Sequence, residues 1–181
     1  MSRQYFADMP QDPPIANLTA VTATTETILW NVSNYTPINA NEARPGKVWK
    51  VTAGGIMSFA STGSLTITPR FGLTVGAGVT MGANATALIT PGATTNAPWY
   101  LEFCCVCRTV GAPGATSTVI GTGFFITDAV LTSQSTAGGQ FAIGGTSATV
   151  DVSIATGICI GWTLSVAGTV TPQFAFIQSM N

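Results

Sequence analysis

The chain has 181 residues and a net charge of −1, with six Lys and Arg residues against seven Asp and Glu residues. This balance leaves no basic surface to neutralise phosphates, which excludes nucleic acid as an expected partner. The chain holds no histidine, which excludes Ser-His-Asp and Cys-His catalysis, histidine-ligated metal and an imidazole switch. Only 7% of the residues are charged and 46% are hydrophobic, whereas ordinary domains are about 25% charged. We therefore expect much of the surface to face copies of the same chain or another protein.

Residues 1–17 differ from the rest of the chain, because they hold three prolines and no periodic apolar pattern. Proline fixes φ and removes a backbone donor, so we predict an extended N-terminal arm. The aromatic side chains of Tyr5 and Phe6 would let the arm dock on a neighbouring subunit. The alternative interpretation of this segment is a frayed terminus. The candidate partner-binding residues of the arm are Tyr5, Phe6, Pro10, Pro13 and Pro14.

The same segment lacks the apolar core of a signal peptide, and no stretch of about 20 continuous apolar residues follows it. We therefore expect synthesis in a host cytoplasm without a signal peptide, and no membrane partner.

From Leu18 onward the sequence is rich in Thr, Val, Ile, aromatic residues and Gly, which favours strands over helices. Pairs that contain glycine or proline separate the segments and predict turns. We predict one domain over residues 18–181, an all-β antiparallel β-sandwich of jelly-roll type with about eight to ten strands. The predicted strands are 26–32, 47–53, 56–61, 64–71, 85–90, 98–110, 117–127, 148–155, 158–166 and 169–179. The predicted turns are Gly54-Gly55, Thr62-Gly63, Pro91-Gly92, Pro113-Gly114, Gly138-Gly139, Gly144-Gly145 and Gly168, with loops at 72–82 and 138–145.

The segment 98–110 shows the alternation of a strand with one buried face. The first face is apolar and is predicted to lie in the core: Leu101, Phe103, Cys105 and Cys107. The second face mixes charged, aromatic and aliphatic side chains, which suits a subunit interface: Tyr100, Glu102, Cys104, Val106 and Arg108.

The four cysteines are Cys104, Cys105, Cys107 and Cys159. Three are crowded into one apolar segment, unlike the spread cysteines of a disulfide framework, so we expect reduced thiols that pack as small hydrophobic groups. The alternative is a metal or redox site in which Cys159 approaches Cys105 and Cys107. Zinc sites favour C-x(2–4)-C spacing in loops and four ligands, so we expect no metal and no cofactor.

Two carboxylates in a cleft would suffice for a glycan-processing enzyme. Glu102, Asp128 and Asp151 lie in or beside predicted strands, but no spacing brings two of them together. We expect solvated side chains or ion pairs, with Asp151 facing outward, and no enzymatic activity. The tryptophans are expected to be core or interface anchors: Trp30, Trp49, Trp99 and Trp162. The sequence also allows a carbohydrate-binding role, but it does not indicate which residues would form the binding site.

Three segments carry a resemblance to a known family. They are RPGKVWKVTAGGIMSFASTGSLTITPRFG at 44–72, PWYLEFCCVCRTVG at 98–111 and TVTPQFAFIQSMN at 169–181. The chain after about Leu29 resembles small jelly-roll virion proteins of tailed bacteriophages, especially those infecting actinobacteria. The shared motifs are structural and include no catalytic signature.

The resemblance implies a non-enzymatic structural protein located on the virion. Its favoured form is a capsid decoration (cement) protein, which binds the outer capsid surface as a homotrimer and stabilises it. In that form the arm at 1–17 would grip the major capsid protein. The alternative is a tail-fibre or head-fibre domain that binds a host surface glycan, and a glycan-processing enzyme is the weakest of the three hypotheses. A closed trimer would also bury apolar patches that a monomer scarcely tolerates.

Overall fold

The computed structural model describes residues 20–22, 24–28, 38–72, 78–81, 87–89, 93–114, 116–130, 137–165 and 168–180. The described residues form strands and no helix. The strands are β1 (Thr27–Ile28), β2 (Val48–Phe59), β3 (Leu65–Phe71), β4 (Val79–Thr80), β5 (Ala87–Ile89), β6 (Thr94–Thr109), β7 (Ser117–Val130), β8 (Ala137–Val150), β9 (Ile158–Leu164) and β10 (Gly168–Met180). Within these residues there is accordingly no helix of the length and hydropathy needed to cross a membrane.

Some of the predicted features lie outside the described residues. They are the arm at 1–17 with Tyr5, Phe6, Pro10, Pro13 and Pro14, the residue Trp30, and the turn at Pro91-Gly92.

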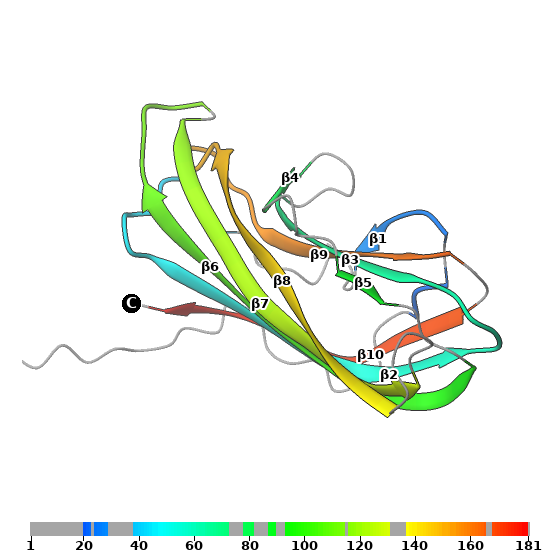
Figure 1. The fold of residues 1–181 in the computed structure, drawn as a ribbon. Helices are drawn as coiled ribbons and strands as arrows, with labels where there is room; N and C mark the ends of the chain where they lie inside the picture. Colours follow the sequence, from blue (N-terminus) through cyan, green and yellow to red (C-terminus); the bar gives the residue numbers. More distant parts are fainter. Residues whose placement is uncertain are drawn as a thin grey trace, which may run out of the picture.

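The strands form two antiparallel sheets that make a sandwich (Figure 1). The larger sheet has the order β10-β2-β6-β7-β8. The smaller sheet has the order β1-β9-β3-β4, with β5 also paired to β3. The predicted all-β antiparallel sandwich is confirmed.

A two-stranded ribbon passes from one sheet to the other in the manner of a jelly roll. β2 pairs with β10 in the larger sheet and continues into β3, which pairs with β9 in the smaller sheet. Where the ribbon crosses, the Ser64 N–H donates to Ser165 Oγ at 2.7 Å and the Ser165 N–H donates to Ser64 O at 3.0 Å. The strands β6, β7 and β8 then extend the larger sheet as a meander.

An aromatic cluster joins the two sheets in the core. The ring centroid of Trp162 in β9 lies 5.0 Å from that of Trp99 in β6 and 5.6 Å from that of Phe125 in β7. Such aromatic pairs contribute about 0.5–1.5 kcal/mol beyond the burial of their area. Trp49 is buried as well, so the described tryptophans are core anchors, as predicted.

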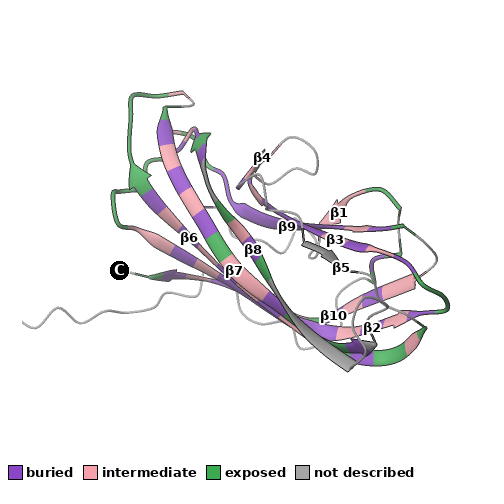
Figure 2. Ribbon diagram, in the orientation of Figure 1, coloured by how far each residue is buried: buried purple, intermediate pink, exposed green. Residues whose placement is uncertain are grey.

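The alternation predicted for 98–110 is confirmed, and Figure 2 shows the same alternation of burial along neighbouring strands. The side chains predicted for the core are fully buried: Leu101, Phe103, Cys105 and Cys107. Those on the second face are half-buried or exposed: Tyr100, Glu102, Cys104, Val106 and Arg108.

The predicted turn at Gly54-Gly55 is wrong, because β2 runs unbroken through both residues. Both glycines allow close approach of a neighbouring strand rather than a bend. A Cβ on Gly54 would lie 2.6 Å from the ring of Phe174, and a Cβ on Gly55 would lie 2.9 Å from Pro172 Cα. The register of β10 against β2 shifts between Pro172 and Phe174, so the glycines face a bulge on an edge strand.

The loop predicted at 138–145, with turns at Gly138-Gly139 and Gly144-Gly145, is also wrong, because these residues lie within β8. Gly144 and Gly145 have φ of 83° and 111°, and the register of β7 against β8 shifts between Ile120 and Thr122. This is the geometry of a bulge, for which glycine supplies positive φ.

Four other expected turns and loops have mixed outcomes. Gly168 begins β10 instead of forming a turn, and the glycine is needed because a Cβ there would lie 2.5 Å from the ring of Phe59, its register partner on β2. The turns Thr62-Gly63 and Pro113-Gly114 do lie between strands. The loop predicted at 72–82 contains the short strand β4, which pairs with β3.

Asp151 does not lie in a strand, so the strand predicted at 148–155 is wrong beyond the end of β8 at Val150. Its carboxylate accepts hydrogen bonds from the Ser153 hydroxyl at 2.6 Å and from the Ser153 N–H at 2.9 Å. These bonds lower the pKa of Asp151, the hydroxyl contributing most. They also replace the ladder that the strand would need, because a short polar side chain that binds its own backbone two residues on favours a turn.

Candidate functional site

The outer face of the larger sheet carries a set of partly accessible apolar side chains. Each is half-buried or exposed, whereas most of its neighbours along the strand point into the core and are buried. We call this set the apolar outer face. Its members are Val48, Ile56, Tyr100, Val106, Ile120, Phe124, Ile126, Phe174, Phe176 and Met180.

The register of the strands places these side chains beside one another. Two adjacent rows cross β10, β2, β6 and β7 in that order: Phe174, Gly54, Tyr100 and Ile126, then Phe176, Thr52, Glu102 and Phe124. The ring centroids of Phe174 and Phe176 are 6.3 Å apart, and those of Tyr100 and Phe124 are 6.2 Å apart. Gly54 has no side chain, so the Phe174 ring lies over the β2 backbone. The result is an aromatic surface that spans several strands.

One ion pair lies among these apolar side chains. Lys50 Nζ is 2.8 Å from Glu102 Oε2, and the Tyr100 hydroxyl donates to the same oxygen at 3.1 Å. The hydrogen bond with Glu102 raises the pKa of Lys50. Burial raises the pKa of Tyr100, and its hydrogen bond to Glu102 adds to the effect. The two charges compensate each other, which lowers the penalty for covering this surface with a partner.

The cysteines are divided between faces and sheets. Cys105 and Cys107 are buried on the inner face of β6, Cys104 is half-buried on its outer face, and Cys159 is buried in β9 of the smaller sheet. Burial raises the pKa of all four thiols, to about 11 for Cys159. The three buried cysteines therefore pack as neutral small side chains, as predicted. In the described ranges, no group of three or more metal-ligating side chains is present.

The three acids considered for catalysis have separate environments. Glu102 is paired with Lys50, Asp128 is exposed on β7, and Asp151 accepts hydrogen bonds from Ser153 after β8. These are the ion-paired and solvated arrangements that the sequence indicated.

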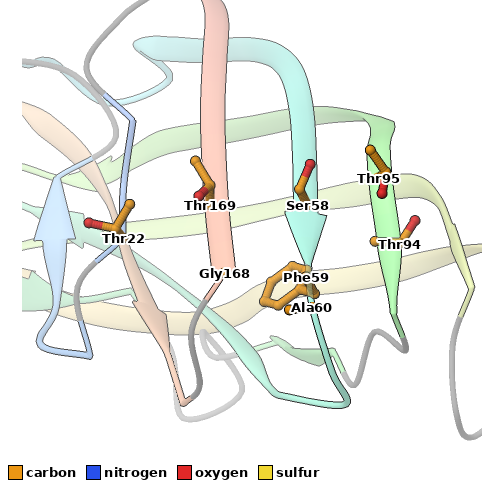
Figure 3. Close-up of a pocket in the computed structure, with 8 residues that line it drawn as sticks. All are labelled: Thr22, Ser58, Phe59, Ala60, Thr94, Thr95, Gly168 and Thr169. Atoms are coloured by element: carbon orange, nitrogen blue, oxygen red, sulfur yellow. The ribbon is translucent and has the colours of Figure 1, made fainter.

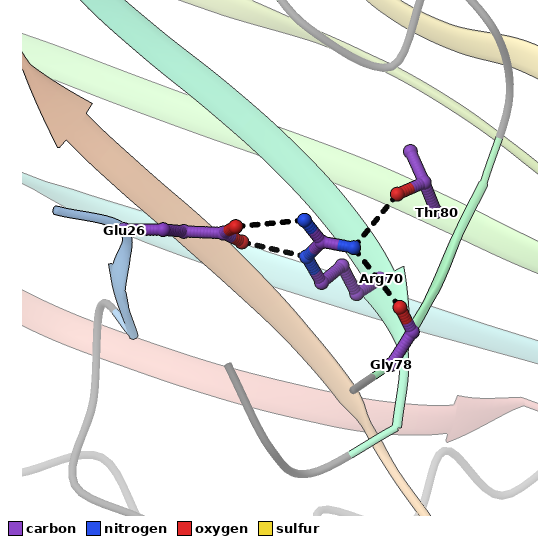
Figure 4. A network of polar contacts seen from close by, with 4 residues as sticks. All are labelled: Glu26, Arg70, Gly78 and Thr80. Carbon is purple, nitrogen blue, oxygen red and sulfur yellow. Dashed lines mark hydrogen bonds and ion pairs between the residues drawn. The ribbon is translucent and has the colours of Figure 1, made fainter. Parts of the chain in front are cut away.

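A second ion pair, which the sequence did not indicate, connects the residue before β1 to β3 (Figure 4). Arg70 donates from Nε to Glu26 Oε1 at 2.6 Å and from Nη2 to Glu26 Oε2 at 2.7 Å. Its Nη1 donates to Gly78 O at 3.0 Å and to Thr80 Oγ1 at 2.8 Å. The hydrogen bond with Glu26 raises the pKa of Arg70. Because these contacts occupy every nitrogen of the guanidinium group, this cluster fastens the fold rather than offering an anion site.

A depression of about 480 Å³ lies where the end of β2 meets the starts of β6 and β10 (Figure 3). Its lining residues are Thr22, Ser58, Phe59, Ala60, Thr94, Thr95, Gly168 and Thr169. None of them carries a charge. The sequence did not indicate this site, because its residues come from four separate segments that only the sheet order brings together.

Comparisons with known proteins give a weak structural similarity. No family model matches the chain, and no curated protein matches it. Among solved structures, the chain is similar to the CBM2 module of the evolved Dit protein of Lactobacillus casei BL23 phage J-1. The sequences are 10% identical, the TM-score is 0.34, and the match covers 90% of this chain and 75% of that module. A similarity of this size assigns no function to the chain.

Proposed function

We propose that this chain is a non-enzymatic structural protein of a phage virion and that it acts through protein contacts made by the apolar outer face. The composition of that face carries the proposal, because aromatic and aliphatic side chains surround the Lys50–Glu102 ion pair and the exposed charges Arg108 and Asp128 lie at the ends of the face. Interface cores are enriched in aromatic side chains and depleted of uncompensated charge.

The dimensions of the apolar outer face suit a protein contact. Strands lie about 4.8 Å apart and rise about 3.3 Å per residue, so the four strands β10, β2, β6 and β7 over residues 48–56 of β2 cover roughly 500 Å² in plane. A standard protein interface buries about 800 Å² per partner, and a surface of roughly 300–600 Å² is already at the upper end for one apolar patch on a monomer. The face is therefore about as large as the largest patch of a typical monomer, which is often a functional contact.

The specific form of the proposal is a capsid decoration protein that binds the outer capsid surface as a homotrimer, with the arm at 1–17 on the major capsid protein. The resemblance of segments 44–72, 98–111 and 169–181 to phage virion proteins supports it. The absence of histidine from the sequence supports a role without catalysis. The alternative form is a tail-fibre or head-fibre domain that binds a host glycan.

Copy number separates these two forms. Quantitative mass spectrometry of purified virions should find hundreds of copies of a decoration protein per particle. A handful of copies would reject capsid decoration and support the fibre form.

Substitution of the apolar outer face tests which contact it makes. We expect Phe124→Ser and Phe176→Ser to dissociate the trimer in sedimentation velocity or to abolish binding to capsids stripped of the protein. Ile154→Ser is the matched control, because Ile154 is 58% exposed and lies outside this face. Thermal melts would confirm that all variants fold. Unchanged trimers together with unchanged capsid binding would reject the proposal.

Deletion of residues 1–17 tests the arm. We expect the truncated chain to keep its fold and to bind capsids more weakly, because the proline-rich composition suits an extended grip rather than part of a sheet. Normal capsid binding by the truncated chain would mean that the arm is only a frayed terminus.

A further inference from the structure

The depression in Figure 3 combines features of a small-molecule site and lies apart from the apolar outer face. Its volume of about 480 Å³ lies within the range of roughly 300–1,000 Å³ that such sites span. Backbone pairing between strands positions the residues that line the depression. Thr169 is the register partner of Ser58 across the β10–β2 pair, and Thr22 follows Val21, which exchanges backbone hydrogen bonds of 2.8 and 3.0 Å with Val170.

The lining is neutral and rich in hydroxyl groups. Five of its side chains are threonine or serine: Thr22, Ser58, Thr94, Thr95 and Thr169. Figure 3 shows these hydroxyl side chains placed around the Phe59 ring and Ala60. Each hydroxyl can both donate and accept a hydrogen bond, so the lining matches a ligand whose own groups do the same.

The hydroxyl groups differ in whether another group of the protein already forms a hydrogen bond with them. Ser58 Oγ accepts from the Asn96 N–H at 2.9 Å and lies 3.4 Å from Asn96 Oδ1, which fixes its position. Within the described residues, the hydroxyls of Thr94, Thr95 and Thr169 form no side-chain hydrogen bond. These three groups are half-buried or exposed, so water solvates them until a ligand with hydroxyl groups replaces it.

We propose that this depression binds a neutral saccharide. An anionic ligand would need a cation, and none of the lining residues carries one. An apolar ligand would remove water from the threonine hydroxyls without replacing its hydrogen bonds, which opposes binding. A sugar ring supplies hydroxyls for the threonines and an apolar C–H face for the aliphatic part of the lining, which includes exposed Ala60 and the threonine methyl groups, whereas the Phe59 ring is buried beneath them. The inference does not depend on capsid decoration, because the site lies at one end of the sheet and uses no member of the apolar outer face; for the fibre form, it names where the glycan would bind.

The test uses the full chain on a glycan array that holds neutral oligosaccharides of glucose, galactose, mannose, rhamnose and N-acetylhexosamines beside sialylated and sulfated ones. Titration of the best-bound neutral sugar by NMR then gives a Kd and the residues whose signals shift. We expect binding to neutral members and shifts at Thr94, Thr95 and Thr169. The absence of binding to every neutral member, or preference for the anionic members, would overturn the proposal.

Removal of hydroxyl groups provides the second arm of the test. The double variant Thr95→Val/Thr169→Val keeps the side-chain shape and should raise the Kd at least tenfold. Thr171→Val is the matched control, because Thr171 lies on the same strand, pairs with Ile56 and is outside the depression. Thermal melts establish that each variant is folded. A folded double variant that binds the sugar as tightly as the wild type would place the binding elsewhere and overturn the proposal.

Discussion

Replacement of Glu26 by glutamine should destabilise the chain by about 2 kcal/mol. The Glu26 and Arg70 side chains are 18% and 17% exposed, so their pair lies between two limits. Exposed pairs contribute about 0–1 kcal/mol, and loss of one partner from a buried pair costs about 3–5 kcal/mol. Glu26→Gln removes the charge and turns an amide N–H₂ group toward the guanidinium donors. The amide oxygen of the glutamine can keep one of the two hydrogen bonds, and Gly78 O and the Thr80 hydroxyl still accept from Nη1, so one nitrogen of Arg70 loses its acceptor and the guanidinium loses its counter-charge.

The assay is urea and thermal unfolding followed by circular dichroism. A loss of this size should lower Tm by about 4–8 °C in a chain of this length. A double-mutant cycle with Arg70→Met isolates the coupling between the two side chains. Glu42→Gln is the matched control, because Glu42 and Lys47 form a looser ion pair of 3.7 Å. A coupling energy for Glu26 and Arg70 no larger than that of the control pair would refute the reasoning.

Two further predictions concern the thiols. Burial raises the pKa of Cys159 from 9.0 to about 11. The stability contributed by its neutral thiol is therefore complete below pH 9 and is lost as pH rises toward 11. In Cys159→Ala, the urea midpoint should fall less steeply with pH over that range than in the wild type, and an unchanged slope would contradict the burial of the thiol. Cys104 is the half-buried cysteine, whereas Cys105, Cys107 and Cys159 are buried, so maleimide should label Cys104 first in the folded chain, as read by mass spectrometry. Protection of Cys104 in intact virions would support a partner over the apolar outer face, and equal labelling in virions and in the free chain would speak against it.

Alternation of side chains predicted the fold class and the two faces of β6, because a strand with one buried face must place every second residue in the core. It did not predict how the glycines act. A glycine in a turn and a glycine beneath an aromatic ring cannot be distinguished from the local sequence. The ring that covers Gly54 belongs to Phe174, which is far from Gly54 in the sequence.

The candidate sites depended in the same way on tertiary order. The sequence placed Tyr100, Glu102 and Val106 on a face suited to an interface. It could not add Phe174 and Phe176, because that requires knowing that β10 lies next to β2. The hydroxyl-lined depression and the contact between Glu26 and Arg70 likewise could not be predicted from the sequence, because each joins segments that are far apart along the chain.

The ribbon that crosses between the sheets constrains how the chain folds during synthesis. β2 and β3 emerge early, yet their partners β10 and β9 are among the last strands to be made. At about 5–20 residues per second, β2 waits roughly 5–20 s on the ribosome before residues 168–180 appear. During this interval one edge of β2 is unpaired and Gly54 lacks the ring that covers it. Long-range strand pairing of this kind is slow and exposed to aggregation. Slower synthesis at constant temperature lengthens this interval and should therefore lower the yield of folded chain.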